Sequence, residues 1–227
     1  MSELEFYFDP VCPFAWMTSK WVRLVKTQKP IDVDWRFIAL RFVNDSVDYE
    51  THFPAHYQRL HTAGLELLRI AAAVKAKFDN ETVARLYEAY GHEIFEISKE
   101  RQGELSEDTV RFVKPILMKL DLEADLAEAA LDTSFDDLIR KETEYALSLT
   151  GKDVGTPILH FNPPNGTALF GPVISRLPSP EQAVELWDHV VGLSRFAGFA
   201  ELKRSLRETP QLKVFGYEGN STETSAH

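Results

Sequence analysis

Cys12 is the residue best suited to nucleophilic or redox chemistry, and it is the single cysteine among 227 residues. It follows an apolar and aromatic run at residues 3–8 and stands directly before Pro13, where a helix is expected to begin. A helix N-terminus offers unpaired N–H groups and partial positive charge, which both stabilise a thiolate. We therefore expect a lowered pKa for Cys12 and a reactive thiol rather than a buried structural one.

A second candidate element is Gly155-Thr156-Pro157, which comes directly before another apolar run. A proline that opens a strand next to a reactive thiol is a natural position for a cis peptide bond. A cis bond there would leave the N–H and C=O of Thr156 free to pair with an extended substrate. Most X-Pro bonds are trans, so this expectation depends on Cys12 and Pro13 lying beside Pro157.

The elements that must position these residues can be predicted from the hydrophobic pattern. We expect a buried strand at 3–8, a helix from Pro13 to about Thr27 and a half-buried strand at 31–38, which together form a parallel βαβ unit. Two further strands at 157–161 and 167–170 are separated by NPPNG, which is typical of a hairpin loop. A helix at about 180–196 follows them.

Residues 43–150 contain helical patterns and no strand signal. The expected helices are an aliphatic one over 60–74, one over 83–97 capped by Asp79 or Asn80, one that starts at Ser106 and is kinked or ended by Pro115, and two shorter ones near 123–131 and 135–149. Without this block the order is βαβ and ββα. The sequence therefore predicts an α/β thioredoxin-like domain at 1–42 and 151–206, a helical insertion domain at 43–150 and a polar, flexible tail at 207–227.

Composition excludes several classes of partner. The net charge of −10 and the pI near 5.2 argue against nucleic acid and anionic membranes, which attract basic surfaces. No apolar stretch approaches the roughly 20 residues of a membrane span. The first residues are acidic, unlike a signal peptide, and one cysteine cannot form an intramolecular disulfide. We expect a cytoplasmic protein.

Three motifs separated by a helical insertion carry a resemblance to a known family. DPVCPFAW at 9–16, DVGTP at 153–157 and FGPV at 170–173 resemble the DsbA-like thioredoxin-fold family. The chain is most similar to its actinobacterial cytoplasmic branch, which includes mycothiol-dependent nitroreductases and mycoredoxin-like oxidoreductases; ELKRS at 201–205 also fits. The resemblance implies that Cys12 is the nucleophile, that Pro157 is the cis-proline and that Thr156 pairs with the substrate backbone.

The family pattern is Cys-x-x-Cys, and Ala15 stands where the resolving cysteine would be. A mixed disulfide at Cys12 must then be resolved by a second molecule. The resemblance implies a small thiol as cosubstrate, mycothiol or glutathione, with no tightly bound cofactor, and a disulfide or electrophilic substrate. Pro13, Phe14 and Ala15 would line its site. Ala15 is interpreted as native, although a substituted resolving cysteine would give the same sequence; nitroreductase activity ranks below thiol exchange.

Two alternatives remain open. One is an enzyme similar to kappa-type glutathione transferases and isomerases, in which a hydroxyl stabilises the thiolate of the bound thiol. The other is a redox-inactive module that binds peptide strands beside Pro157. The pKa of Cys12 separates catalysis from binding alone: a value of about 8.5 or above favours the binding module, and a strongly lowered one favours catalysis.

Two other groups of side chains have simpler interpretations than a functional site. His52, His56 and His61 lack a further ligand, so no metal site is expected. The aromatic residues of the second helix fit core packing better than a substrate lid; they are Tyr87, Tyr90, His92 and Phe95. Substrate identity and oligomeric state do not follow from the sequence.

Overall fold

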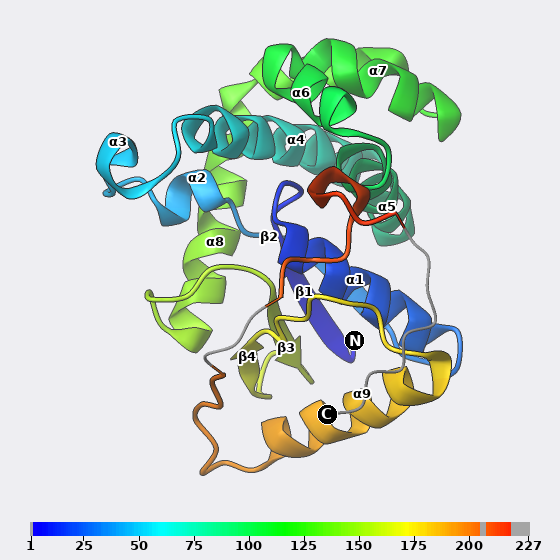
Figure 1. The fold of residues 1–227 in the computed structure, drawn as a ribbon, viewed down its shortest axis with the longest axis vertical. Coiled ribbons are helices and arrows are strands. Elements are labelled where there is room, and N and C mark those ends of the chain that lie inside the picture. The colour runs from blue at the N-terminus through cyan, green and yellow to red at the C-terminus, as the bar shows by residue number, and fades with distance from the viewer. Residues whose placement is uncertain (1, 205–207, 219–227) are drawn as a thin grey trace.

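The computed structural model describes residues 2–204 and 208–218. Its centre is a four-stranded sheet in the order β2-β1-β3-β4. The strands are β1 (Leu4–Phe8), β2 (Val33–Phe37), β3 (Ile158–Phe161) and β4 (Ala168–Phe170). β1 pairs parallel to β2 and antiparallel to β3, and β3 pairs antiparallel to β4. The predicted βαβ unit and hairpin are confirmed, and the α/β fold is a thioredoxin-like one with a helical insertion (Figure 1).

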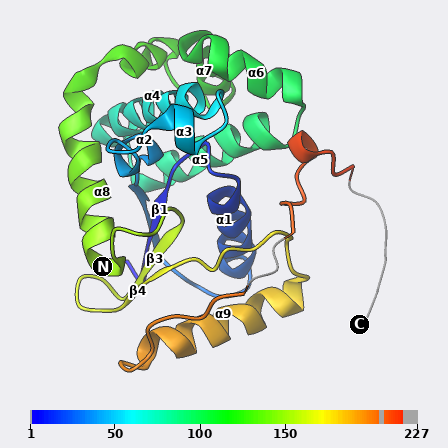
Figure 2. The ribbon, with the colours of Figure 1, turned by 60° about the vertical axis from the view of Figure 1, so that its left-hand side comes forward.

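Helices cover both faces of this sheet. α1 (Pro13–Lys26) begins at the N-cap Cys12 with Pro13 in its first turn, and its apolar side packs toward the sheet. α8 (Asp136–Thr150) covers the opposite face, as Figure 2 shows, and ends at Gly151 with a positive φ of 105°. α9 (Pro180–Arg195) starts with a capping box at Ser179 and lies against α1, where the Trp21 indole donates to the Ala183 carbonyl at 2.9 Å.

The remaining helices come between β2 and α8 in the sequence. They are α2 (Leu40–Val43), α3 (Tyr49–His52), α4 (Tyr57–Lys77), α5 (Asn80–Phe95), α6 (Lys99–Glu107), α7 (Thr109–Lys119) and the 3-10 segments η1 (Ala124–Leu131) and η2 (Thr133–Phe135). Asp79 caps α5 by accepting from the Thr82 N–H, as the sequence allowed. The helical pattern starts at Leu40, three residues before the boundary expected at 43.

The predicted start of the third helix at Ser106 was wrong. Ser106 lies inside α6, and the carboxylate of Asp108 caps α7 by accepting from the Arg111 N–H at 2.9 Å. Asp108 is at once the C-cap of α6 and the N-cap of α7, so two helices meet where one start was expected. Pro115 lies inside α7, which continues to Lys119, since proline removes one backbone hydrogen bond without ending every helix.

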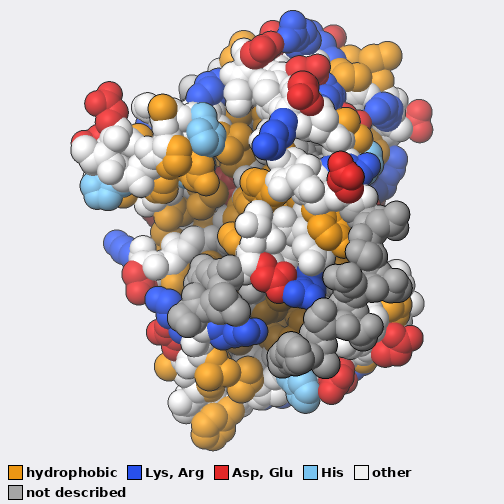
Figure 3. Space-filling view, in the orientation of Figure 1, with side chains coloured by type: hydrophobic (Ala, Val, Ile, Leu, Met, Phe, Trp, Pro, Cys, Tyr) orange, Lys and Arg blue, Asp and Glu red, His pale blue; other side chains and the backbone are white. Residues whose placement is uncertain are grey.

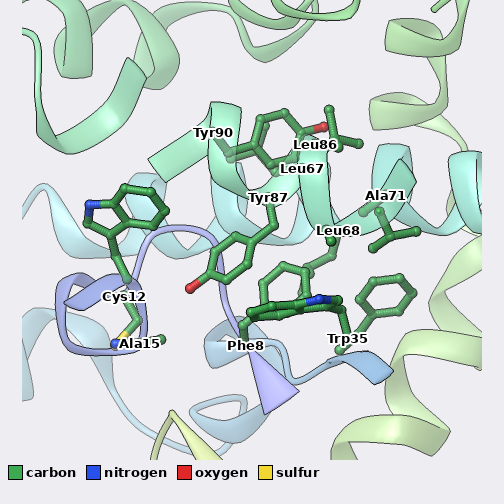
Figure 4. Close-up of a cluster of buried hydrophobic side chains, with 14 of the residues drawn as sticks. Phe8, Cys12, Ala15, Trp35, Leu67, Leu68, Ala71, Leu86, Tyr87 and Tyr90 are labelled. Carbon is green, nitrogen blue, oxygen red and sulfur yellow. The ribbon is translucent and has the colours of Figure 1, made fainter. Parts of the chain in front are cut away.

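The helical block packs on the sheet mainly through one large hydrophobic core (Figure 4), and α8 adds Ala146 to a second, smaller cluster with Tyr7 and Ile158. Tyr87 of α5 stacks on Phe8 of β1 with ring centroids 3.8 Å apart, and Trp35 of β2 meets Tyr87 edge-on. Trp16 of α1 lies against Gly91 of α5 so closely that a Cβ there would be 2.1 Å from the indole. These contacts hold α1, which carries Cys12 at its N-terminus, between the sheet and α5.

The segment after α9 differs from the expected polar tail. Within residues 208–218, Leu212 and Val214 are buried in the main core around η3 (Lys213–Phe215), which contacts α5 and α6. The prediction of a polar, flexible tail rested on the average polarity of the segment, which does not show that these two apolar side chains pack in the core. Residues 207 and 219–227 of the predicted tail, and the last residue of ELKRS, lie outside the described residues.

Candidate active site

Cys12 is the N-cap of α1, and its sulfur lies between two backbone groups from distant parts of the chain. Sγ accepts a hydrogen bond from the Ala15 N–H at 3.4 Å, and the thiol donates to the carbonyl oxygen of Thr156 at 3.4 Å. The residue adopts the extended conformation usual for an N-cap, with φ −85° and ψ 113°. The structure therefore brings Cys12 and Thr156 into direct contact at the edge of the sheet where β1 ends and the neighbouring β3 begins.

The loop that carries Thr156 is fixed to the centre of the sheet. The Thr156 hydroxyl donates to the carbonyl oxygen of Tyr7 in β1 at 3.0 Å, and the Thr156–Pro157 peptide bond is cis. The Pro157 carbonyl accepts from the Gly171 N–H at 2.9 Å. Thr156 and Pro157 are both buried, so Cys12 faces a tightly packed loop.

Asp9, three residues before Cys12, forms the base of the site. One carboxylate oxygen accepts from the Val11 N–H at 3.0 Å, and the other accepts from the Leu40 N–H at 2.7 Å. The side chain has no exposed surface, and burial raises its pKa to about 7 although the two N–H groups lower it. A Cβ on Gly64 of α4 would lie 2.7 Å from this carboxylate. Asp9 thus ties the β1–α1 turn to α2, with α4 directly behind it.

The ionisation of Cys12 differs in direction from the sequence-based expectation. Burial raises the pKa of the thiol to about 12; the Ala15 N–H lowers it, the nearby Asp9 carboxylate raises it and the Phe14 N–H lowers it. Only 8% of the residue is exposed, so loss of water outweighs the donors at the helix N-terminus. In this arrangement Cys12 is a protonated thiol that acts as a hydrogen-bond donor. A raised pKa is the outcome expected of the redox-inactive binding module, so catalysis requires that the thiol lose its proton when a substrate binds.

The other predicted site residues surround the sulfur. Pro13 and Phe14 form the exposed side of the first turn of α1 and are half-buried, whereas Ala15 is fully buried. Trp16 enters the core, and its indole N–H donates to Glu96 at 3.1 Å. Figure 3, drawn in the orientation of Figure 1, shows hydrophobic side chains gathered below α2 and α3, where the surface is recessed.

The histidines and tyrosines take other positions. His52 and His56 are exposed, and buried His61 is within 3.0 Å of the Tyr49 hydroxyl through Nδ1. Among residues 2–204 and 208–218, no three His, Cys, Asp or Glu side chains come together as metal ligands. The core interpretation fits the buried side chains of α5, which are Tyr87, Tyr90 and Phe95, while His92 is exposed.

The chain is similar in sequence to one protein family and one curated protein, and similar in fold to a solved enzyme structure. Residues 11–204 match the family model Rv2466c-like, described as mycothiol-dependent nitroreductase Rv2466c. The chain is 32% identical over 206 residues to an uncharacterized protein, Rv2286c, of Mycobacterium tuberculosis, covering 90% of this chain and 82% of that protein. It also resembles the structure of a 2-hydroxychromene-2-carboxylate isomerase with a TM-score of 0.55 at 12% identity, covering 85% of this chain and 96% of the isomerase. In the part of the chain that the structure describes, none of the helices is long and apolar enough to span a bilayer.

Proposed function

The chain belongs to the Rv2466c-like family of mycothiol-dependent nitroreductases, and from this we propose that it is a monothiol oxidoreductase that exchanges disulfides with mycothiol through Cys12. One observation carries the proposal. The single cysteine caps α1 opposite Thr156 and Pro157, and the residue three positions on is the thiol-free Ala15. The site therefore contains one thiol, and a small thiol from solution must act as the second one in the exchange.

The proposed cycle has two thiol–disulfide exchanges. In the first, the Cys12 thiolate attacks a mycothiol-containing disulfide, a Cys12–mycothiol disulfide forms, and the other half leaves as a thiolate that takes up a proton. In the second, the thiolate of another mycothiol attacks the mycothiol sulfur of that bond, which releases mycothiol disulfide and returns the Cys12 thiolate. The enzyme is unchanged over the cycle, and both electrons pass to the substrate thiol.

The contacts of the sulfur suggest how this cycle is started and ended. Because burial keeps Cys12 protonated by raising its pKa, its proton must leave as the disulfide docks, not before. The N–H of Ala15 stabilises the negative sulfur both as it attacks and as it departs. The Thr156 carbonyl loses its thiol donor at the same step and becomes available, as the family pattern implies, to an extended substrate.

Reduction of a nitro group fits the same electron count. One Cys12 thiol and one mycothiol thiol together supply two electrons and two protons, so that a nitro group becomes a nitroso group and water while the Cys12–mycothiol disulfide forms. A second mycothiol then regenerates Cys12 as above. The family description motivates this variant, and we rank it below simple exchange because a second enzyme thiol is lacking.

Intact-mass spectrometry tests the proposal directly, because a single cysteine allows a single site. Reduced protein treated with mycothiol disulfide should gain one mycothiol group per chain, and excess mycothiol should remove it. Cys12→Ser should gain nothing, and parallel reactions with glutathione and bacillithiol disulfides identify the preferred thiol. Absence of the adduct on the unaltered protein, or the same adduct on Cys12→Ser, would contradict the proposal.

A second candidate function is favoured by the protonated state of the thiol. Cys12 acts as a donor here, as a hydroxyl would in a kappa-type transferase or isomerase, where it would stabilise the thiolate of a bound small thiol. Serine keeps such a donor and alanine does not. If Cys12→Ser retains activity with a thiol and an electrophile while Cys12→Ala loses it, the transferase-like function replaces the exchange mechanism.

A further inference from the structure

The hydroxyl of Tyr87 is a buried polar group without a hydrogen bond of good geometry. Its oxygen is inaccessible to solvent, and only 1% of the residue is exposed. The ring itself is fully used in packing: it stacks on Phe8, and Trp16 and Trp35 meet it edge-on. A phenylalanine would make the same ring contacts without leaving an unsatisfied donor, which costs free energy. The hydroxyl is therefore not explained by packing.

The surroundings of this hydroxyl include the reactive thiol. Figure 4 shows the Tyr87 oxygen directed from α5 toward the turn of α1 that carries Cys12 and Ala15. The charged and titratable groups that act on it electrostatically are Cys12, Arg23 and Asp9. The Ser19 hydroxyl, which donates to the Trp16 carbonyl, lies near enough to accept a hydrogen bond from Tyr87 and competes with the sulfur for it. Burial raises the pKa of Tyr87, so the phenol keeps its proton and remains able to donate a hydrogen bond.

We propose that the Tyr87 hydroxyl donates a hydrogen bond to the Cys12 sulfur once that sulfur is negative. In the protonated state the thiol is satisfied by the Thr156 carbonyl and the Ala15 N–H, and the Tyr87 hydroxyl makes no hydrogen bond to it. When the thiol loses its proton, the contact with the Thr156 carbonyl becomes repulsive and the sulfur needs another donor. The Tyr87 hydroxyl is a buried side-chain donor directed at this turn.

The proposal deepens the proposed function, on which it rests, by adding a residue to the same site. A donor to the thiolate stabilises Cys12 as it attacks and makes it a better leaving group when a second thiol resolves the mixed disulfide. A Cys-x-x-Cys enzyme has a second thiol near its nucleophile, whereas this chain has Ala15. Tyr87, on the helical insertion, would supply a donor that the motif lacks.

Tyr90 provides a matched control one turn further along α5. Its hydroxyl is also buried and unpaired, but Figure 4 shows it pointing away from Cys12. The alkylation rate of Cys12 by iodoacetamide should be measured by intact mass between pH 7 and 10 for Tyr87→Phe, Tyr90→Phe and the unaltered protein. We expect Tyr87→Phe to be about tenfold slower throughout this range, the effect of one hydrogen bond to a charged group, and Tyr90→Phe to be unchanged.

Equal rates for all three proteins, or equal slowing by both substitutions, would overturn the proposal. A second measurement needs no tyrosine variant. With tyrosines labelled at the ring carbon that bears oxygen, the Tyr87 resonance should shift as Cys12 ionises in the unaltered protein and stay constant in Cys12→Ser; constancy in both overturns the proposal. Neither measurement uses mycothiol, so the result is distinct from failure of the mycothiol-adduct test.

Discussion

The sulfur of Cys12 lies 3.4 Å from the carbonyl oxygen of Thr156, a residue 144 positions later in the chain. This contact joins the N-terminal βαβ unit to the ββα half across the middle of the site. It also favours the protonated state of the sulfur, since a carbonyl oxygen attracts a thiol proton and repels a thiolate. The reduced site is thus closed around a protonated cysteine.

The first prediction concerns the pH profile of alkylation. Because burial raises the pKa of Cys12 to about 12, the thiolate fraction at neutral pH is small and should grow tenfold with each pH unit. The rate of iodoacetamide alkylation of the folded protein should therefore rise without a plateau from pH 7 to 10. The same protein unfolded in urea should level off near the ordinary cysteine pKa of about 8.5. A plateau below pH 8 in the folded protein would show that the helix N-terminus outweighs burial.

A second prediction concerns the missing resolving thiol. Ala15 is fully buried and its N–H already contacts the Cys12 sulfur at 3.4 Å. Ala15→Cys should convert the mycothiol adduct into a disulfide between Cys12 and the introduced thiol, seen by mass as loss of the mycothiol group and of two hydrogens relative to the reduced protein. Thr27→Cys, exposed at the other end of α1, adds a thiol too far away and should leave the adduct in place. A persistent adduct in Ala15→Cys would mean that position 15 cannot reach the mixed disulfide.

A third prediction concerns Asp9 and stability. The folded pKa of about 7 exceeds the ordinary value of 3.8, so between about pH 4 and 7 the folded protein holds a proton that the unfolded chain releases. The contribution of Asp9 to the free energy of unfolding is therefore fully present below pH 4 and falls as pH rises to 7, by up to about 4 kcal/mol. Asp9→Asn stays neutral and should lack this fall.

Urea unfolding at pH 5 and pH 8 measures this difference. The stability gap between the unaltered protein and Asp9→Asn should narrow at the higher pH. Asp79→Asn is the matched control, because Asp79 caps α5 at the surface, its pKa is lowered rather than raised, and asparagine is an equally good N-cap. A gap for Asp9→Asn that is the same at both pH values would contradict a titration near pH 7.

Local signals predicted most of the elements that hold the site. The Cys12-Pro13 pair indicated where α1 begins, and NPPNG indicated the β3–β4 hairpin, because caps and tight turns depend on a few adjacent residues. The prediction that a helix starts at Ser106 was wrong because adjacent residues alone could not decide between two possible caps. Both Ser106 and Asp108 are good N-caps, and the choice of Asp108 depends on α6 and α7 packing on α4 and α5.

Long-range packing determined what the sequence could not indicate. The expected lowering of the Cys12 pKa considered only its own helix, whereas the loop at Thr156 and the carboxylate of Asp9 bury and oppose the charge. Tyr87 lies 75 positions after Cys12, and no spacing rule connects them. Its ring was correctly expected in the core, but its approach to the thiol follows from how α5 packs on α1 and β1.

The packing of α5 on α1 gives the last prediction. A Cβ at position 91 would lie 2.1 Å from the indole of Trp16, so Gly91→Ala must displace that indole and disturb its hydrogen bond to Glu96. We expect a loss of about 1–3 kcal/mol in the free energy of unfolding in urea. Gly103→Ala in α6 has open space around the new methyl group and should be neutral or stabilising by up to about 1 kcal/mol. Since Trp16 is four residues after Cys12 on α1, Gly91→Ala should also change the alkylation rate of Cys12 while Gly103→Ala leaves it constant. Equal stability of the two variants would contradict this prediction, because it would mean that α5 can move away from α1 at little cost in free energy.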